Sequence, residues 1–154
     1  IGHVQTNKVK FMAEYVSLIH GVDSFKLLEE INKQAKKHNR VIDCLLQVHI
    51  AEEETKFGLD EEELNEIFEI LKQVQYDNIR IVGLMGMATF TENTTQIEKE
   101  FKHLKNVFDT INLDCTDAIN RVSTLSMGMS GDYQLAISCG STMVRIGSSI
   151  FGTR

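Results

Sequence analysis

The apolar residues of this chain fall into two patterns, short aliphatic runs and longer stretches in which they recur every three or four positions. A short aliphatic run bounded by polar residues or glycine is typical of a strand buried on both faces. Six such runs predict strands: Ile1–Gln5, Val16–His20, Val41–Ile50, Ile79–Met87, Val122–Ser126 and Met143–Ile146. The predicted strands are therefore spread over the whole chain rather than grouped in one half.

Stretches with helical spacing separate these runs. Apolar residues from Phe25 onward predict a helix that ends near Lys37, and Asp23 or Ser24 is placed to cap its start. Asp60 precedes a second stripe of apolar residues with the same spacing. Further helices are predicted at 96–110, at 131–139 and, as a short one, directly after the opening run.

Strands that alternate with helices in this way indicate an α/β fold with a parallel sheet, either an open doubly wound sheet or a (β/α)8 barrel. We favour the barrel because the candidate functional groups follow strand ends, where the loops of a barrel build its site. These candidates are Gln5, Asn7, His20, His49, Met87, Ser126, Arg145 and Gly147. A complete barrel needs about 250 residues, so a single domain over 1–154 predicts about three quarters of a TIM barrel.

The first residues read as the middle of a strand rather than as a frayed terminus, and they do not begin with Met. We therefore expect an N-terminally truncated fragment whose outer strands lack partners. Unpaired strand edges recruit other chains. Self-association, or binding of a separate N-terminal segment, is the expected consequence.

Composition narrows the class of protein. The chain is 42% hydrophobic and 25% charged, and its net charge of -6 disfavours nucleic-acid binding, which needs clustered Lys and Arg. No apolar run approaches the roughly 20 residues that span a bilayer, and the start has no signal-peptide pattern, so we expect a cytoplasmic protein without a membrane partner. Cys44, Cys115 and Cys139 are not closely spaced, which favours buried, reduced thiols and predicts neither disulfides nor a metal site.

Two strand ends that contain glycine and serine are the strongest chemical signal. Leu125–Ser130 is followed by Gly140–Ser148, which carries Arg145 between two aliphatic residues. Glycine leaves backbone N–H groups accessible and serine adds a hydroxyl, so such strand ends can surround a phosphate. The structural alternative is that Ser126 only ends a strand and Gly147 only turns the chain.

The sequence carries a family resemblance in four segments: Ile1–Lys10, Gly83–Met85, Leu125–Ser130 and Gly140–Gly152. They resemble the pyridoxal 5′-phosphate homeostasis protein family, also called the YggS/PROSC family. The resemblance runs over the whole chain. It implies a fold-type III barrel like the N-terminal domain of alanine racemase, here lacking its first two strands, with pyridoxal 5′-phosphate (PLP) at the carboxyl ends of the strands. Members of this family are not known to turn over a substrate, so the resemblance implies intracellular PLP binding and homeostasis.

The resemblance also assigns candidate cofactor-binding residues. Ser126, Gly147 and Ser148 would hold the phosphate, and Arg145 would face the pyridine nitrogen. Because a guanidinium does not release its proton, that contact keeps the ring nitrogen unprotonated and weakens the ring as an electron sink. For Arg145 the structural alternative is a salt bridge with a carboxylate.

The remaining candidates are less specific. Met127 would pack beside the ring, and His3 would lie at the mouth of the barrel, although methionines more often fill a core and lone histidines more often have a structural role. The same structural interpretation applies to His20. Family members hold the aldehyde of PLP on a lysine near the end of their first strand, so we expect no Schiff-base lysine and no catalytic residue in this chain. Lys8 and Lys56 belong to later elements and are expected to be solvated.

Two other functions stay open at this point. One is a fold-type III, racemase-like enzyme, which normally adds a C-terminal β-domain that supplies a tyrosine. The other is a lysine-independent barrel that binds a different phosphorylated metabolite non-covalently through Ser126 and Gly147.

Overall fold

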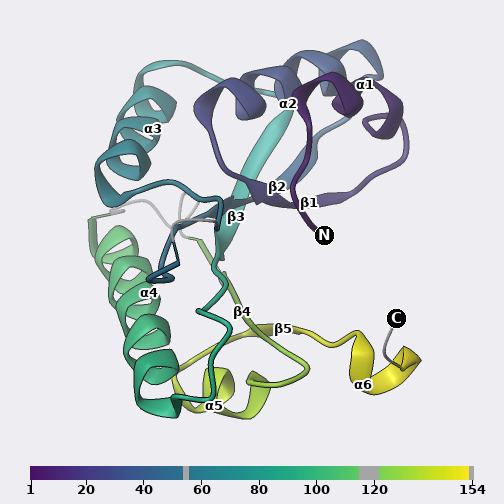
Figure 1. Ribbon diagram of the computed structural model, residues 1–154. Helices are drawn as coiled ribbons and strands as arrows, with labels where there is room; N and C mark the ends of the chain where they lie inside the picture. The colour runs from purple at the N-terminus through teal and green to yellow at the C-terminus, as the bar shows by residue number, and fades with distance from the viewer. Residues whose placement is uncertain (54–55, 115–121, 153–154) are drawn as a thin grey trace.

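The computed structural model contains a curved sheet of parallel strands with helices along its outer side (Figure 1). It describes residues 1–53, 56–114 and 122–152. The strands follow one another across the sheet in chain order: β1 Leu18–Val22, β2 Ile42–Gln47, β3 Ile79–Met85, β4 Thr124–Met129 and β5 Met143–Arg145. Each ladder is parallel, so the carboxyl ends of all strands lie at one edge. Sequential order without a reversal is the arrangement of a barrel rather than of a doubly wound sheet.

Helices form where the apolar spacing predicts them. Their bounds are η1 Thr6–Lys8 (a 3₁₀ turn), α1 Val9–Met12, α2 Phe25–Lys37, α3 Glu61–Gln73, α4 Thr94–Asp114, α5 Tyr133–Ser138 and α6 Ser148–Phe151. The Oγ of Ser24 caps α2 by accepting from the backbone N of Leu27 at 3.4 Å, and Asp60 forms a capping box with Glu63 at the start of α3. Within the described residues, none of these helices is long and apolar enough to cross a membrane.

Residues 1–5 do not form a strand, so the prediction of a sixth strand is wrong. This segment passes β1 closely, because the carbonyl oxygen of Gly2 lies 2.8 Å from where a Cβ on Gly21 would stand. It has no strand pairing in the part of the chain that the structure describes. Ile1 is exposed. Aliphatic character alone therefore did not make a strand here, since a strand also depends on its pairing and packing partners.

Two further boundaries differ from the prediction. β1 lies two residues further along the chain than expected, because its pairing with β2 extends to Val22, opposite Leu46. The short helix α6 has no periodic apolar pattern and was not predicted.

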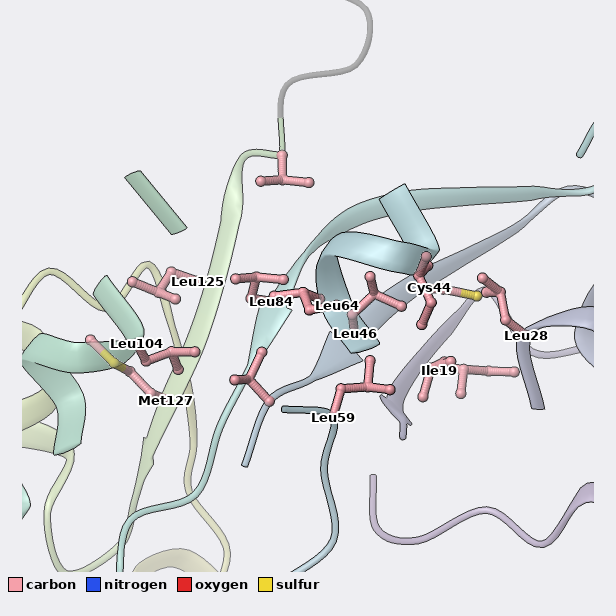
Figure 2. Close-up of a cluster of buried hydrophobic side chains, with 14 of the residues drawn as sticks. Ile19, Leu28, Cys44, Leu46, Leu59, Leu64, Leu84, Leu104, Leu125 and Met127 are labelled. Carbon is pink, nitrogen blue, oxygen red and sulfur yellow. The ribbon is translucent and has the colours of Figure 1, made fainter. Parts of the chain in front are cut away.

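The hydrophobic core lies between the sheet and its helices (Figure 2). At one end of the core Ile19 of β1 lies near Leu28 of α2, and at the other end Met127 of β4 lies near Leu104 of α4. Residues from β1 to β4 contribute one face of their strands to this core, which the helices cover.

The cysteines behave as the sequence predicts wherever the structure describes them. Cys44 and Cys139 are both buried and free, whereas Cys115 lies outside the described residues. Burial, with a smaller contribution from Asp43, raises the pKa of Cys44 to about 12. Cys44 is therefore a core residue and not a reactive thiol.

The opposite face of the sheet lines the inside of its curve. Side chains alternate along a strand, so the neighbours of the core-facing residues point to this inner face. Gln47, Met85 and Ser126 form one row there, because Gln47 pairs with Met85 and Met85 pairs with Ser126 across the ladders. All three are buried. This row lies near the carboxyl edge and forms the floor of the region that follows the strands.

The joint between β3 and β4 depends on a glycine. A Cβ on Gly83 would stand 1.8 Å from the carbonyl oxygen of Thr124, its partner in the ladder. Any larger residue must push the two backbones apart, so the close approach of β3 and β4 requires glycine.

Candidate functional site

Arg145 ties three neighbouring strands together at the carboxyl edge. It is the last residue of β5 and is 8% exposed. Its Nη1 donates to the carbonyl oxygen of Ser126 at 2.9 Å and to the Oγ of Ser126 at 2.7 Å. Its Nη2 donates to the carbonyl oxygen of Gly86, one residue beyond β3, at 2.9 Å. The guanidinium therefore reaches from β5 across β4 to the end of β3.

The charge of Arg145 is surrounded by neutral oxygens. Burial lowers the pKa of this guanidinium and the more distant Asp132 raises it, but an arginine stays protonated at any ordinary pH. No salt bridge to Arg145 occurs among the described residues. The predicted structural alternative for this residue is therefore not found there. A buried charge of this kind is costly unless a further partner compensates it.

A second polar cluster lies directly after β5. Ser130, the residue that follows β4, accepts at its Oγ from the backbone N of Gly147 at 3.1 Å and from that of Ser149 at 3.4 Å. Ser148 lies between these two residues and is exposed. A single oxygen thus already collects two N–H donors of the turn, as an oxygen of a bound phosphate would.

At the other end of the same edge, after β1 and β2, polar side chains are paired within the chain. The Nδ1 of His3 lies 2.8 Å from the Oδ2 of Asp23, directly after β1, and the His3 ring stacks on Phe57 with centroids 4.2 Å apart. The Nε2 of Gln47 donates to the carbonyl oxygen of Phe57 at 2.6 Å. His3 therefore lies at the carboxyl edge, with Asp23 and Phe57 as its described contacts.

The residues that the resemblance groups around one phosphate differ in burial and in hydrogen-bond partners. Ser126 is fully buried and bonded to Arg145, whereas Gly147 and Ser148 are exposed and lie beside Ser130. The Met127 side chain is buried in the core near Leu104, on the helix-facing side of β4, so its placement gives no support to a role beside a cofactor ring. That these residues, Met127 included, and Arg145 and His3 bind a cofactor stays a prediction.

Two contributors to this region were missed from the sequence. Ser130 ends the Leu125–Ser130 motif and follows a strand, which is the signal that could have marked it. Gly86 takes part through its carbonyl oxygen, and a backbone contact of this kind leaves no trace in the residue type.

The two lysines considered earlier have different surroundings. Lys8 is exposed, as predicted. The side chain of Lys56 is only 26% exposed, and its Nζ lies 3.4 Å from the carboxylate of Glu53. Lys56 is therefore half-buried and paired, which corrects the prediction that it is a solvated residue.

Glu100 of α4 holds the loops that follow β2 and β3. Its carboxylate accepts from the backbone N of Glu52 at 3.2 Å, from the N and Oγ1 of Thr89 at 2.7 Å each, and from the Nε2 of Gln96 at 3.2 Å. Burial raises the pKa of the Glu100 carboxyl, but these hydrogen bonds together outweigh burial and the pKa is lowered. Thr89 follows Gly86 closely, so Glu100 stabilises the loop that presents the Gly86 carbonyl to Arg145.

Comparison with known proteins agrees with this architecture. The profile of the family described as alanine racemase, N-terminal domain, matches residues 1–154. The chain is 40% identical over 154 residues to the pyridoxal phosphate homeostasis protein of Aquifex aeolicus and 35% identical over 155 residues to that of Pasteurella multocida. Both matches cover 100% of this chain, which spans 65% and 64% of the length of these relatives.

Solved structures agree on the fold. PipY of Synechococcus elongatus, solved with PLP bound, matches with a TM-score of 0.86 and 29% identity, over 99% of this chain and 68% of PipY. An alanine racemase of Clostridium difficile matches with a TM-score of 0.72 and 17% identity, over 100% of this chain and 41% of the racemase. At that identity the second match speaks for the fold alone. The prediction of a partial (β/α)8 barrel of the alanine racemase type is confirmed.

Proposed function

Because the chain belongs to the alanine racemase N-terminal domain family, we propose that it is the PLP-binding part of a protein of intracellular PLP homeostasis, with no substrate turnover of its own. The names of its relatives and the PLP-bound state of PipY support this proposal. The cytoplasm is its proposed location, and the free, buried thiols of Cys44 and Cys139 fit a reducing compartment.

The observation that carries the proposal is the guanidinium of Arg145, buried at the carboxyl edge with neutral oxygens as its described partners. Three of its N–H donors are used in these bonds, out of five that an arginine has. A ligand with a lone pair or negative charge is the natural complement of such a group. The pyridine nitrogen of PLP is a lone-pair acceptor of this kind.

The turn after β5 fits the phosphate. The N–H groups of Gly147 and Ser149 already point at one oxygen, the Oγ of Ser130. Ser148 adds an exposed hydroxyl. In this proposal Gly147 and Ser148 hold the phosphate, Arg145 faces the ring, and Ser126 orients Arg145 through its Oγ instead of touching the phosphate. His3 borders the same edge. Bound PLP would supply a reactive aldehyde. In this proposal no lysine of the chain forms a Schiff base with it.

Titration of the 154-residue chain with PLP tests the proposal. We expect saturable binding, seen as a change in PLP absorbance and in the ³¹P NMR signal, and competition by inorganic phosphate. Pyridoxal, which lacks the phosphate, serves as the matched control ligand and should bind at least about tenfold more weakly. After borohydride treatment, mass spectrometry should find no lysine modified in stoichiometric amount.

The outcomes separate the candidate functions. A chain that does not bind PLP contradicts the proposal, and one fully modified lysine contradicts its non-covalent form. PLP that binds no more tightly than inorganic phosphate favours a different phosphorylated metabolite. Racemisation of alanine by a full-length protein that contains this chain favours the enzyme.

A further inference from the structure

His20 has a buried nitrogen that the rest of the site does not use. Its Nδ1 is shielded from solvent and has no hydrogen-bond partner among the described residues. Buried polar atoms are almost always paired, so an unpaired one in a native fold calls for a missing water, ion or ligand. His20 is not among the residues assigned to the cofactor above.

The position of His20 in β1 directs its side chain to the inner face. Ile19 points to the helices, toward Leu28 of α2 (Figure 2), and it pairs with Cys44, which also lies in the helix-facing core. Val22 also lies in this core and pairs with Leu46. The irregular register between Ile19 and Val22 therefore leaves His20 and Gly21 together on the other face, where a Cβ on Gly21 would lie 3.1 Å from the Oε1 of Gln47. That is the face on which Ser126 and Arg145 meet.

The surroundings of His20 are positive and apolar. Burial lowers its pKa, and the guanidinium of Arg145 lowers it further. Ile19 pairs with Cys44 and Val22 with Leu46, so β2 contributes the uncharged Leu45 at this level. The imidazole is therefore neutral near pH 7 and carries one proton, which either ring nitrogen can hold.

A neutral imidazole near the Arg145 cation suits an anionic oxygen. With its proton on Nδ1, His20 can donate to such an oxygen, and the positive charge of Arg145 adds to the attraction. PLP carries two anionic oxygen groups, the phosphate and the oxygen on ring carbon C3. The turn at Gly147 accounts for the phosphate, which leaves the C3 oxygen without an assigned partner on this chain.

We propose that His20 is a direct contact of the bound ligand and donates from Nδ1 to the C3 oxygen of the pyridine ring. This inference rests on the proposed PLP binding and adds a residue of β1 to a site otherwise built from β3, β4 and β5. The ring then lies on the inner face between the first and last strands of the sheet, with Arg145 at its nitrogen.

Binding of PLP and of its 3-O-methyl ether to three variants tests the contact. His20→Phe removes the donor and should weaken PLP binding about tenfold, the effect of one hydrogen bond to a charged oxygen. His20→Asn keeps a polar group near the Nδ1 position and should stay within about threefold of the unchanged chain. His38→Phe, the same substitution at an exposed histidine after α2, should have no effect. The 3-O-methyl ether should bind the unchanged chain and His20→Phe equally.

A second readout does not depend on the substitutions folding well. In the unchanged chain, ¹⁵N and ¹H NMR of the imidazoles should show the His20 Nδ1 signal shifting when PLP is added, while the His38 signals stay in place. Two results would overturn this inference and leave the proposed function intact. One is that His20→Phe binds PLP as tightly as the unchanged chain, and the other is that the His20 Nδ1 signal of the unchanged chain does not shift when PLP binds. A chain that does not bind PLP at all overturns both.

Discussion

At the β1–β2 end of the carboxyl edge His3 pairs with Asp23 and Gln47 bonds to the Phe57 carbonyl, whereas at the β4–β5 end the Arg145 guanidinium contacts neutral oxygens. Both ends are polar and both are built from residues that follow parallel strands. They differ in whether a carboxylate is present. The imidazole of His3 has a carboxylate beside it, while Arg145 has none within salt-bridge distance in the described residues.

The difference shows where a ligand contributes most. A side chain that already has a carboxylate partner gains little from an added anion, because the new interaction replaces an existing one. A buried guanidinium held by neutral groups gains much more, since the desolvation cost is present before the ligand arrives. The β4–β5 end is therefore expected to gain most from a ligand. At the β1–β2 end His3 and Gln47 already have partners within the chain, whereas the Nδ1 of His20 has none among the described residues.

Replacing Arg145 tests most directly whether the β4–β5 end dominates ligand binding. Arg145→Met removes the unpaired charge and should weaken PLP binding by about 100-fold or more, as expected when a buried charged contact is lost. The matched control is Arg80→Met, because Arg80 is paired to Asp43 at 2.8 and 2.9 Å and its side chain is 68% exposed. PLP titrations on both variants measure the effect, and circular dichroism checks that they are folded. Binding by Arg145→Met within threefold of the unchanged chain would refute the asymmetry.

Forcing β3 and β4 apart tests how far the stability of the fold depends on their close contact. Gly83→Ala places a Cβ 1.8 Å from the Thr124 carbonyl at the β3–β4 joint and should lower the free energy of unfolding by about 3 kcal/mol. Gly131→Ala is the control, since a Cβ there meets nothing within 4 Å. Denaturant unfolding gives both values. Equal stability of the two variants would mean that the joint relaxes freely.

Replacing Glu100, which holds the loops after β2 and β3, should have the smallest effect, and this effect should depend on pH. Glu100→Gln weakens the bonds to Glu52 and Thr89 and should cost about 2 kcal/mol at pH 7. The folded-state pKa of Glu100 is lowered from 4.5, so its stabilisation is present above pH 4.5 and is lost as the pH falls through the folded-state value. Thermal unfolding from pH 7 to 3 should show the difference between the two chains shrinking below about pH 4.5.

The control for that experiment is Glu98→Gln, which alters an exposed ion pair with Lys102 on the same helix. It should change stability by no more than about 0.5 kcal/mol at pH 7. A difference for Glu100→Gln that is independent of pH would show that the carboxylate charge is not what holds the loops.

Much of the fold was predictable because periodicity reflects burial. The helix from Phe25 to Lys37 was predicted to the residue at its end, and Ser24 and Asp60 cap as expected. The aliphatic runs of β2 and β3 were found as strands. β2 is buried over most of its length, and β3 is buried in its second half. Where burial does not decide, prediction failed: Ile1–Gln5 is aliphatic but unpaired, and α6 forms without an apolar stripe.

The residues of the candidate site were singled out from the sequence, but the contacts between them were not. Arg145 was singled out because a charge within an aliphatic strand is costly to bury unless a partner compensates it. Among the described residues, no carboxylate pairs with it. The hydrogen bonds of Ser126 with Arg145 and of Ser130 with Gly147 depend on the register between β4 and β5. The irregular register between these strands is a tertiary property that spacing along the chain does not contain.

From the sequence alone came the alternation of strands and helices, the order of the elements and the two motifs that end β4 and β5, because each follows from local periodicity and residue type. Only the tertiary structure decided that Ser126 supports Arg145 instead of lying at the turn, that Met127 belongs to the core, and that His20 faces the inner side with an unpaired nitrogen. The reason is physical: which groups meet depends on strand register and sheet curvature, and these arise from packing between segments far apart in the chain.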